Sequence, residues 1–166
     1  MIPEIKKILY STDLSENARY AFGYAASLAN RYGAGITLLH VLEDVSTYAD
    51  SMVINIVGEE KWGELRKNNE QDVLETIKER LEKFCEDVSN NLPACPFITD
   101  EIIVKTGNPV EEILNQAKRS DCDMVVMGTR GHGILADAVI GSTSRRVLRR
   151  CKKPVLIVHL PKNERD

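Results

Sequence analysis

Glycine and hydroxyl residues are concentrated in one segment of this chain, residues 128–144, which reads GTRGHGILADAVIGSTS. Glycines allow backbone N–H groups to approach phosphate oxygens closely. The segment ends in Gly141–Ser144, at the start of a predicted helix whose unpaired N–H groups and positive dipole favour an anion. The hydroxyls of Ser142, Thr143 and Ser144 can donate to that anion or can simply cap the helix. The segment therefore predicts a phosphate site or, in the simpler interpretation, a capped helix.

Two common phosphate motifs do not describe this segment. The P-loop pattern requires lysine after its second glycine, where this chain has Ile134. The dinucleotide pattern is formally matched by Gly131, Gly133 and Ala136, but no acidic residue follows about 20 positions later to hold a ribose. Neither a P-loop enzyme nor a nicotinamide-dependent enzyme is therefore predicted.

A second candidate group, Ser11–Thr12–Asp13, follows the first predicted strand. Asp13 stands three residues before Glu16, as in a capping box, so it is predicted either to cap the next helix or to contact a ligand. Of the histidines, His132 lies in the glycine-rich segment and is interpreted as an exposed loop residue, although it could reach a phosphate. His40 and His159 lie in predicted strands and are interpreted as satisfied core or interface residues.

These groups must be positioned by alternating strands and helices. Apolar runs predict five strands, and stripes at helical spacing predict helices between them, one of which starts at Asn108–Pro109 and one at about residue 142. Because the runs are continuously apolar, the fold class is α/β, an open doubly wound parallel sheet with helices on both faces. The predicted strands are residues 6–12, 36–42, 98–105, 123–128 and 155–160.

Strand order decides where a ligand binds, because the crevice lies where the order reverses. The common orders are 2-1-3-4-5 and 3-2-1-4-5. In the second, the reversal falls between the first and fourth strands, which would bring residues 11–13 and 128–133 together.

Residues 43–60 form a long connection with an apolar patch, predicted as a lid, a partner surface or a loop packed on the domain.

Composition limits the remaining possibilities. The 166 residues predict a single domain, residues 1–162, with a frayed tail at 163–166. A net charge of −3 and 5% aromatic residues argue against a nucleic-acid or membrane binder. The four cysteines form no CxxC pair, no metal site is predicted, and no leader sequence is visible, so we expect a cytoplasmic protein with reduced thiols. The basic last helix is interpreted as complementing its dipole, with a phosphate or nucleic-acid contact as the alternative.

The spacing Gly128-x2-Gly131-x9-Gly141-Ser142 resembles the signature of the universal stress protein family, in its ATP-binding branch. The segments ILYSTDLSENA, LLHVLED and KKPVLIVHL are similar to that family's first, second and last strands, so the resemblance covers nearly the whole chain.

The resemblance implies strand order 3-2-1-4-5 and a set of ATP contacts. Asp13 and the backbone of Val41 would hold adenine. The ribose and adenine region would be lined by Ser11, Thr12, Met127 and Gly128, and the phosphates would be received by Gly131, Gly141, Ser142, Thr143 and Ser144. Mg²⁺ or Mn²⁺ would be held through the phosphates. The resemblance further implies a homodimer through the last strand, whose apolar edge is compatible with pairing.

Catalytic groups are sparse around these residues. Hydrolysis of ATP requires a positioned water, a base and charge stabilisation, and only Asp13 could serve as a base. The chain is therefore expected to be a regulatory nucleotide-binding module with little turnover and no catalytic residue. The alternative is a weak ATPase or phosphotransferase that a partner protein could stimulate. A phospho-acceptor receiver domain is disfavoured, because the third strand ends in Lys105–Thr106–Gly107 instead of an aspartate.

Overall fold

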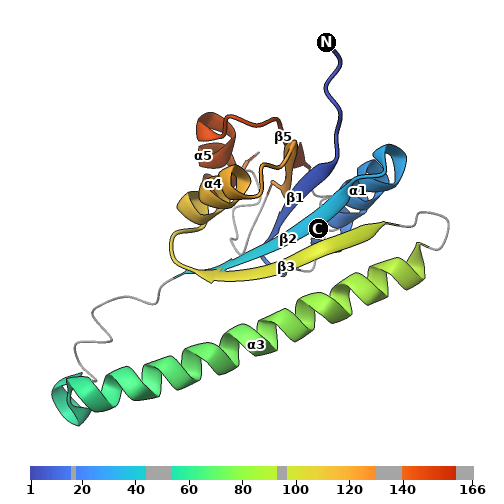
Figure 1. The fold of residues 1–166 in the computed structure, drawn as a ribbon. Helices are drawn as coiled ribbons and strands as arrows, with labels where there is room; N and C mark the ends of the chain where they lie inside the picture. The colour runs from blue at the N-terminus through green and yellow to red at the C-terminus, as the bar shows by residue number, and fades with distance from the viewer. Residues whose placement is uncertain (16–17, 44–53, 93–96, 130–139, 160–166) are drawn as a thin grey trace, which may run out of the picture.

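The computed structural model describes residues 1–15, 18–43, 54–92, 97–129 and 140–159 (Figure 1). Strands and helices alternate along these residues as predicted, with one extra helical turn at 54–57. The elements are β1 (Lys7–Thr12), α1 (Ala18–Tyr32), β2 (Gly35–Leu42), α3 (Glu59–Asn91), β3 (Ile98–Thr106), α4 (Pro109–Arg119), β4 (Met124–Gly128), α5 (Ser142–Arg150) and β5 (Val155–Val158).

The strands form one parallel sheet in the order β3-β2-β1-β4-β5, which confirms the predicted fold class and order. In the register, Ser11 of β1 lies opposite Met127 of β4 and Thr12 lies opposite His40 of β2. The order reverses between β1 and β4, so a ligand crevice is expected at their carboxyl ends.

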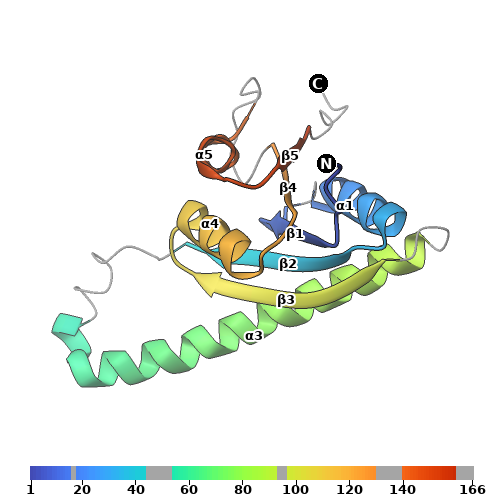
Figure 2. The ribbon, with the colours of Figure 1, turned by 45° about the horizontal axis from the view of Figure 1, so that its top comes forward.

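Helices cover both faces of the sheet (Figure 2). On one face, α1 and α3 bury residues such as Phe22 and Leu81 against β1 and β2. On the other face, α4 and α5 bury residues such as Ile113 and Val147 against β1, β2 and β4. Burial on both faces explains the continuously apolar strands. Within the described residues, no helix is long and apolar enough to span a membrane.

The three phenylalanines of the chain lie in one aromatic cluster between α1, α3 and the sheet. Phe22 has its ring centroid 5.2 Å from that of Phe84 and 5.3 Å from that of Phe97. The ring of Tyr10 on β1 packs at a tilt against Phe22, with a centroid distance of 5.0 Å, and its hydroxyl donates to the carbonyl of Ala18 at 2.8 Å. Burial raises the pKa of the Tyr10 phenol, so this donor stays protonated. The cluster fixes α1 and α3 to the same face of the sheet.

Helix α3 is longer than the sheet that it covers (Figure 1). Its 33 residues span about 50 Å at 1.5 Å per residue. Among its described side chains, the buried ones are Ile77, Leu81 and Val88, which lie in its second half and belong to the predicted apolar stripe, while Val73 of that stripe is 48% exposed. The first half extends beyond the sheet.

Several predictions fall on residues outside the described ranges. They concern Gly131 and His132 of the glycine-rich segment, residues 44–53 of the long connection and the tail at 163–166.

The histidine interpretations are tested in part: His40 is buried and hydrogen-bonded, whereas His159 is exposed and is not a core residue. The described cysteines, Cys85, Cys122 and Cys151, are all free thiols.

Candidate functional site

The turn after β1 is held in one conformation by its own side chains. Leu14 has a φ of 61°, a left-handed conformation that is uncommon outside glycine. Thr12 Oγ1 accepts a hydrogen bond from the N–H of Leu14 at 3.1 Å, and Asp13 Oδ1 accepts one from the N–H of Ser15 at 3.0 Å. These bonds orient the Asp13 carboxylate, whose Oδ2 atom is shielded from solvent.

The predicted capping role of Asp13 is wrong. The left-handed Leu14 cannot be the first residue of a helix that Asp13 would cap. The carboxylate instead bonds its own turn two residues ahead, which is the Asx-turn alternative open to aspartate. Glu16, the other member of the predicted capping box, lies outside the described residues.

His40 connects β2 to the end of β1. Its Nδ1 atom lies 2.8 Å from the carbonyl oxygen of Thr12, in a buried contact. Since the β1–β2 ladder ends at the Thr12–His40 pair, the next residue of β2, Val41, is level with Asp13. The sequence predicted His40 as a satisfied core or interface residue, which its burial and hydrogen bond confirm, but it gave no indication that this residue positions the end of β1.

The end of β4 is tied to the start of α5 by two hydrogen bonds. The hydroxyl of Ser144 donates to the carbonyl of Gly128 at 2.8 Å, and the N–H of Gly141 donates to the carbonyl of Thr129 at 2.6 Å. Thr129, 3% exposed, also donates its N–H to the carbonyl of Val158 in β5 at 2.9 Å. The first turn of α5 is therefore fixed at the carboxyl edge of the sheet.

This first turn of α5 is open toward an anion. Gly141 occupies the N-cap position in extended conformation and makes no side-chain cap, and the first turn contains no acidic residue. The first intrahelical bond runs from the N–H of Arg145 to the carbonyl of Gly141 at 3.0 Å. The N–H groups of Ser142, Thr143 and Ser144 therefore have no acceptor within the helix, as helix geometry dictates.

The structure brings most of the predicted site residues to one place. The β1–β4 ladder aligns Ser11 with Met127, and the strand ends that follow carry Thr12–Asp13 and Gly128. Ser144 is buried and its hydroxyl proton is used by Gly128, so its role as a phosphate donor through the side chain is weakened. Of the remaining predicted residues, Ser142 is exposed, and Ser11, Asp13, Val41, Gly128, Gly141 and Thr143 are half-buried.

Ion pairs fix the far end of α5. Arg150 makes a bidentate pair with Glu111 of α4, at 2.6 and 3.2 Å, and Lys153 lies 2.8 Å from Asp121. Hydrogen bonding to Arg150 lowers the pKa of Glu111, and hydrogen bonding to Lys153 lowers that of Asp121. Both pairs are exposed, so they orient α5 against α4 more than they stabilise the fold.

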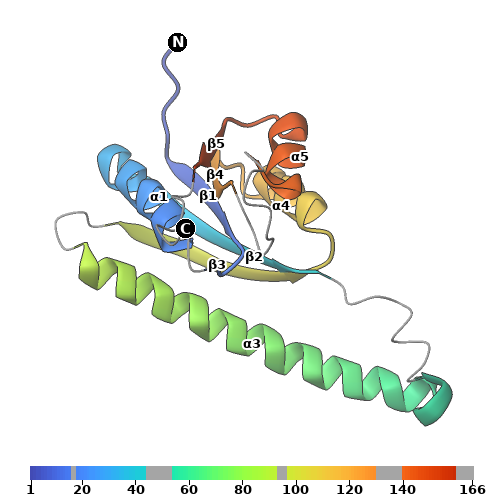
Figure 3. The same ribbon diagram turned by 180° about the vertical axis from the view of Figure 1, so that it is seen from behind.

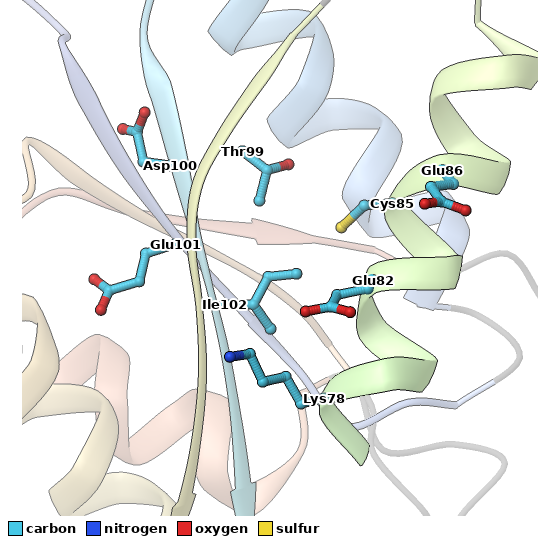
Figure 4. Close-up of a pocket in the computed structure, with 8 residues that line it drawn as sticks. All are labelled: Lys78, Glu82, Cys85, Glu86, Thr99, Asp100, Glu101 and Ile102. Carbon is cyan, nitrogen blue, oxygen red and sulfur yellow. The ribbon is translucent and has the colours of Figure 1, made fainter. Parts of the chain in front are cut away.

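A separate groove of about 520 Å³ lies between α3 and β3. Figure 4 shows its eight lining residues, with Cys85 and Lys78 directed from α3 toward the strand. Burial raises the pKa of the Cys85 thiol, which disfavours the reactive thiolate. The groove lies beside residues 99–102, in the first half of β3, and so is distant from the carboxyl edge described above.

Comparison with known proteins agrees with this geometry. The model of the universal stress protein family matches residues 4–159. The universal stress protein MJ0577 of Methanocaldococcus jannaschii is 28% identical over 153 residues, which are 92% of this chain and 94% of that protein. YxiE of Bacillus subtilis, also a universal stress protein, is 31% identical over 92% of this chain and 97% of its own.

Solved structures show the same fold. The structure of MJ0577 superposes with a TM-score of 0.69 and 27% identity, covering 97% of this chain and all of the other. A universal stress protein in complex with cAMP superposes with a TM-score of 0.63, covering 96% of this chain and 100% of its own. Its identity of 20% makes it a neighbour in fold alone.

Proposed function

Because this chain belongs to the universal stress protein family, we propose that it binds ATP where β1 and β4 end side by side. We infer that it acts there as a nucleotide-dependent regulatory module in a stress response. The site would be formed within a single domain, residues 1–162, of a cytoplasmic protein.

The adenine end of the proposed site is the turn after β1. The Asp13 carboxylate is oriented by its own turn, and Val41 is level with it on the neighbouring strand. A carboxylate and a backbone N–H and C=O pair can match the amino group and ring nitrogens of adenine. Ser11, Thr12 and Met127 belong to the same edge and would pack against the base and the ribose.

The observation that carries the proposal is the open start of α5. Three N–H groups without an intrahelical acceptor, no acidic side chain and no capping side chain form a ready anion site. Gly141 has no side chain that could block an approaching phosphate, and Ser142 and Thr143 add hydroxyl donors. The neighbour in fold that was solved with cAMP holds a ligand that contains both adenine and phosphate. By the family resemblance, Gly131 would also contact the phosphates.

We propose little intrinsic turnover. Asp13, which directly follows β1 at this edge, is the candidate base, and its Oδ1 already accepts a hydrogen bond from Ser15. Mg²⁺ or Mn²⁺ would arrive bound to the phosphates, as Mg²⁺ usually does at nucleotide sites. Electrostatic stabilisation of the phosphates by α5 favours holding ATP, whereas cleavage also needs an oriented water.

The test is to identify the nucleotide that co-purifies with the chain and to substitute one residue at the adenine end and one at the phosphate end of the site. Mass spectrometry of the heat-released ligand should detect ATP, and titration calorimetry should show that Asp13→Ala and Gly141→Val each weaken ATP binding at least about tenfold. Valine is compatible with the φ of −63° at Gly141, so the fold should survive. Gly63→Val, at an open position on α3, is the matched control and should bind like the unmodified chain.

If both site variants retain ATP, the proposed site is wrong. A single-turnover assay with labelled ATP, with and without cell extract, tests the second part of the proposal. Turnover near about 1 per second would contradict a regulatory module and support an ATPase.

We also propose a homodimer through β5. This strand forms one edge of the sheet, and its exposed backbone can pair with a second copy. Sedimentation in high salt should show a dimer at micromolar concentration, and Ile157→Pro should yield a monomer, since proline removes a ladder donor. A monomeric unmodified chain would contradict this proposal.

A further inference from the structure

The exposed side of α5 carries positive charge that the described part of the chain does not neutralise. Arg150 and Lys153 are paired with Glu111 and Asp121. The other four cations of residues 145–153, three on α5 and one just after its end, are exposed and form no ion pair with any described residue. We refer to them as the basic face: Arg145, Arg146, Arg149 and Lys152.

The helix dipole does not account for the whole basic face. Cations are favourable only in the last turn of a helix, whereas Arg145 and Arg146 lie in the first half of α5. Arg145 and Arg149 are four residues apart, an arrangement in which like charges destabilise a helix. Leu148, beside them, is 45% exposed. A short helix with exposed cations that repel one another is expected to have a negatively charged partner.

The opposite face of the molecule carries the complementary charge. Five exposed acids of α3 are spaced three or four residues apart and so form one line along the helix. Lys78, Arg80 and Lys83 lie between them in the sequence but beside that line. None of the five forms an ion pair with a described residue. We refer to them as the acidic stripe: Asp72, Glu75, Glu79, Glu82 and Glu86.

The two surfaces match in the spacing of their charges. The acidic stripe extends for about 21 Å, and Arg145 and Arg149 are separated by about 6 Å, the same rise that separates Glu75 from Glu79. A helix laid along the stripe can therefore pair successive charges one to one. The surfaces cannot meet within one molecule, because α3 and α5 lie on opposite faces of the sheet (Figure 3).

We propose that the basic face of α5 docks on the acidic stripe of α3 in a second copy of this chain. The contact is head-to-tail and joins two different surfaces on opposite faces, so it leaves a free surface at each end and continues into open stacks. Its exposed ion pairs are individually weak, which makes the stacks reversible and sensitive to salt. The contact is independent of nucleotide binding and of pairing through β5.

Sedimentation velocity of the full chain, at rising concentration and in about 20 mM and about 500 mM NaCl, measures this contact. The weight-average sedimentation coefficient should rise with concentration in low salt and return to a constant value in high salt. Arg149→Glu and Glu79→Arg should each abolish the rise. Mixing these two variants should restore the rise in alternating stacks, because the intact surfaces pair with each other and the two changed surfaces, whose charges are exchanged, pair as well. The double variant should stack again, because its charges are exchanged.

Arg31→Glu on α1 and Glu60→Arg, off the stripe on α3, make the same changes in net charge and should stack like the unmodified chain. Two results would overturn the proposal. One is equal self-association of Arg149→Glu and the unmodified chain in low salt. The other is a chain that does not self-associate but binds a short DNA duplex through Arg149, which would assign the basic face to nucleic acid.

Discussion

Two helix starts lie at the same edge of the sheet and on the same face, yet they are built in opposite ways. Helix α4 is closed: Asn108 accepts hydrogen bonds from the N–H groups of Val110 and Glu111, at 3.0 and 3.2 Å. Pro109 has no N–H to satisfy, and the first turn carries two carboxylates. Helix α5 is open: its N-cap is Gly141, with neither a cap nor an acidic residue.

The difference shows how local chemistry assigns a helix start to stability or to binding. Every helix leaves its first N–H groups without internal acceptors. In α4 the chain supplies those acceptors itself, which contributes about 1 kcal/mol to stability. In α5 the acceptors must come from outside the helix, so the same positive end remains available for phosphate.

The largest expected effect comes from closing the open start. Gly141→Asn gives α5 the same N-cap residue type that α4 has at Asn108. The extended backbone of residue 141 allows the new asparagine to cap the helix. We expect ATP affinity to fall at least about tenfold, because phosphate must displace the cap. The melting temperature should stay the same or rise, since asparagine exceeds glycine at an N-cap by only a few tenths of a kcal/mol.

Titration calorimetry with Mg-ATP and thermal denaturation measure these two quantities. Gly141→Ala adds a methyl group without an acceptor and is the control, with a smaller expected loss of affinity. Unchanged ATP binding by Gly141→Asn would remove the phosphate role from the start of α5.

The next effect concerns the bond that anchors α5. Ser144→Ala removes the donor to the carbonyl of Gly128, in a position where the serine is 5% exposed. We expect a loss of about 1–2 kcal/mol in the free energy of unfolding, because a buried acceptor loses its partner. Urea denaturation measures it. Ser142→Ala, on the same turn but exposed, should change stability by less than about 0.5 kcal/mol.

Removing the cap of α4 should affect stability alone. Asn108→Ala is expected to cost about 1 kcal/mol of unfolding free energy, since two N–H groups lose their acceptor. Asn108→Asp keeps an acceptor and should stay close to the unmodified chain. ATP affinity should be the same in all three. A fall in ATP affinity on Asn108→Ala would mean that both helix starts contribute to the site.

The smallest effect concerns the pair that joins the start of α4 to the end of α5. Arg150 lowers the pKa of Glu111 in the folded state, so the pair contributes at neutral pH and its contribution disappears as pH falls through that lowered pKa. Glu111→Gln should therefore lower the melting temperature slightly at pH 7.

In acid, below the usual carboxyl pKa of about 4.3, the melting temperatures of Glu111→Gln and the unmodified chain should converge. Glu112→Gln, in the same turn but without an ion pair to any residue that the structure describes, corrects for the helix dipole. A difference that widens in acid would contradict the assigned pair.

Local rules in the sequence predicted the elements of this fold well. The apolar runs marked all five strands to within two residues, and Asn108–Pro109 marked the start of α4. Capping at Asp13 was wrong, because a capping box and an Asx-turn begin with the same residue types. The backbone of Leu14 decides between them, and no short-range pattern predicts its left-handed φ.

The sequence by itself determined the alternation of strands and helices, the apolar faces and the closed start of α4, because all of these depend on residues within a few positions of one another. Residue patterns left two strand orders open, and the family resemblance selected the order that the structure shows. Only the tertiary structure decided that Ser144 binds Gly128, that His40 binds Thr12 and that Arg150 pairs with Glu111 while Arg149 forms no ion pair with a described residue. These contacts join residues 16 to 39 positions apart, and packing of whole elements, rather than local propensity, selects their partners.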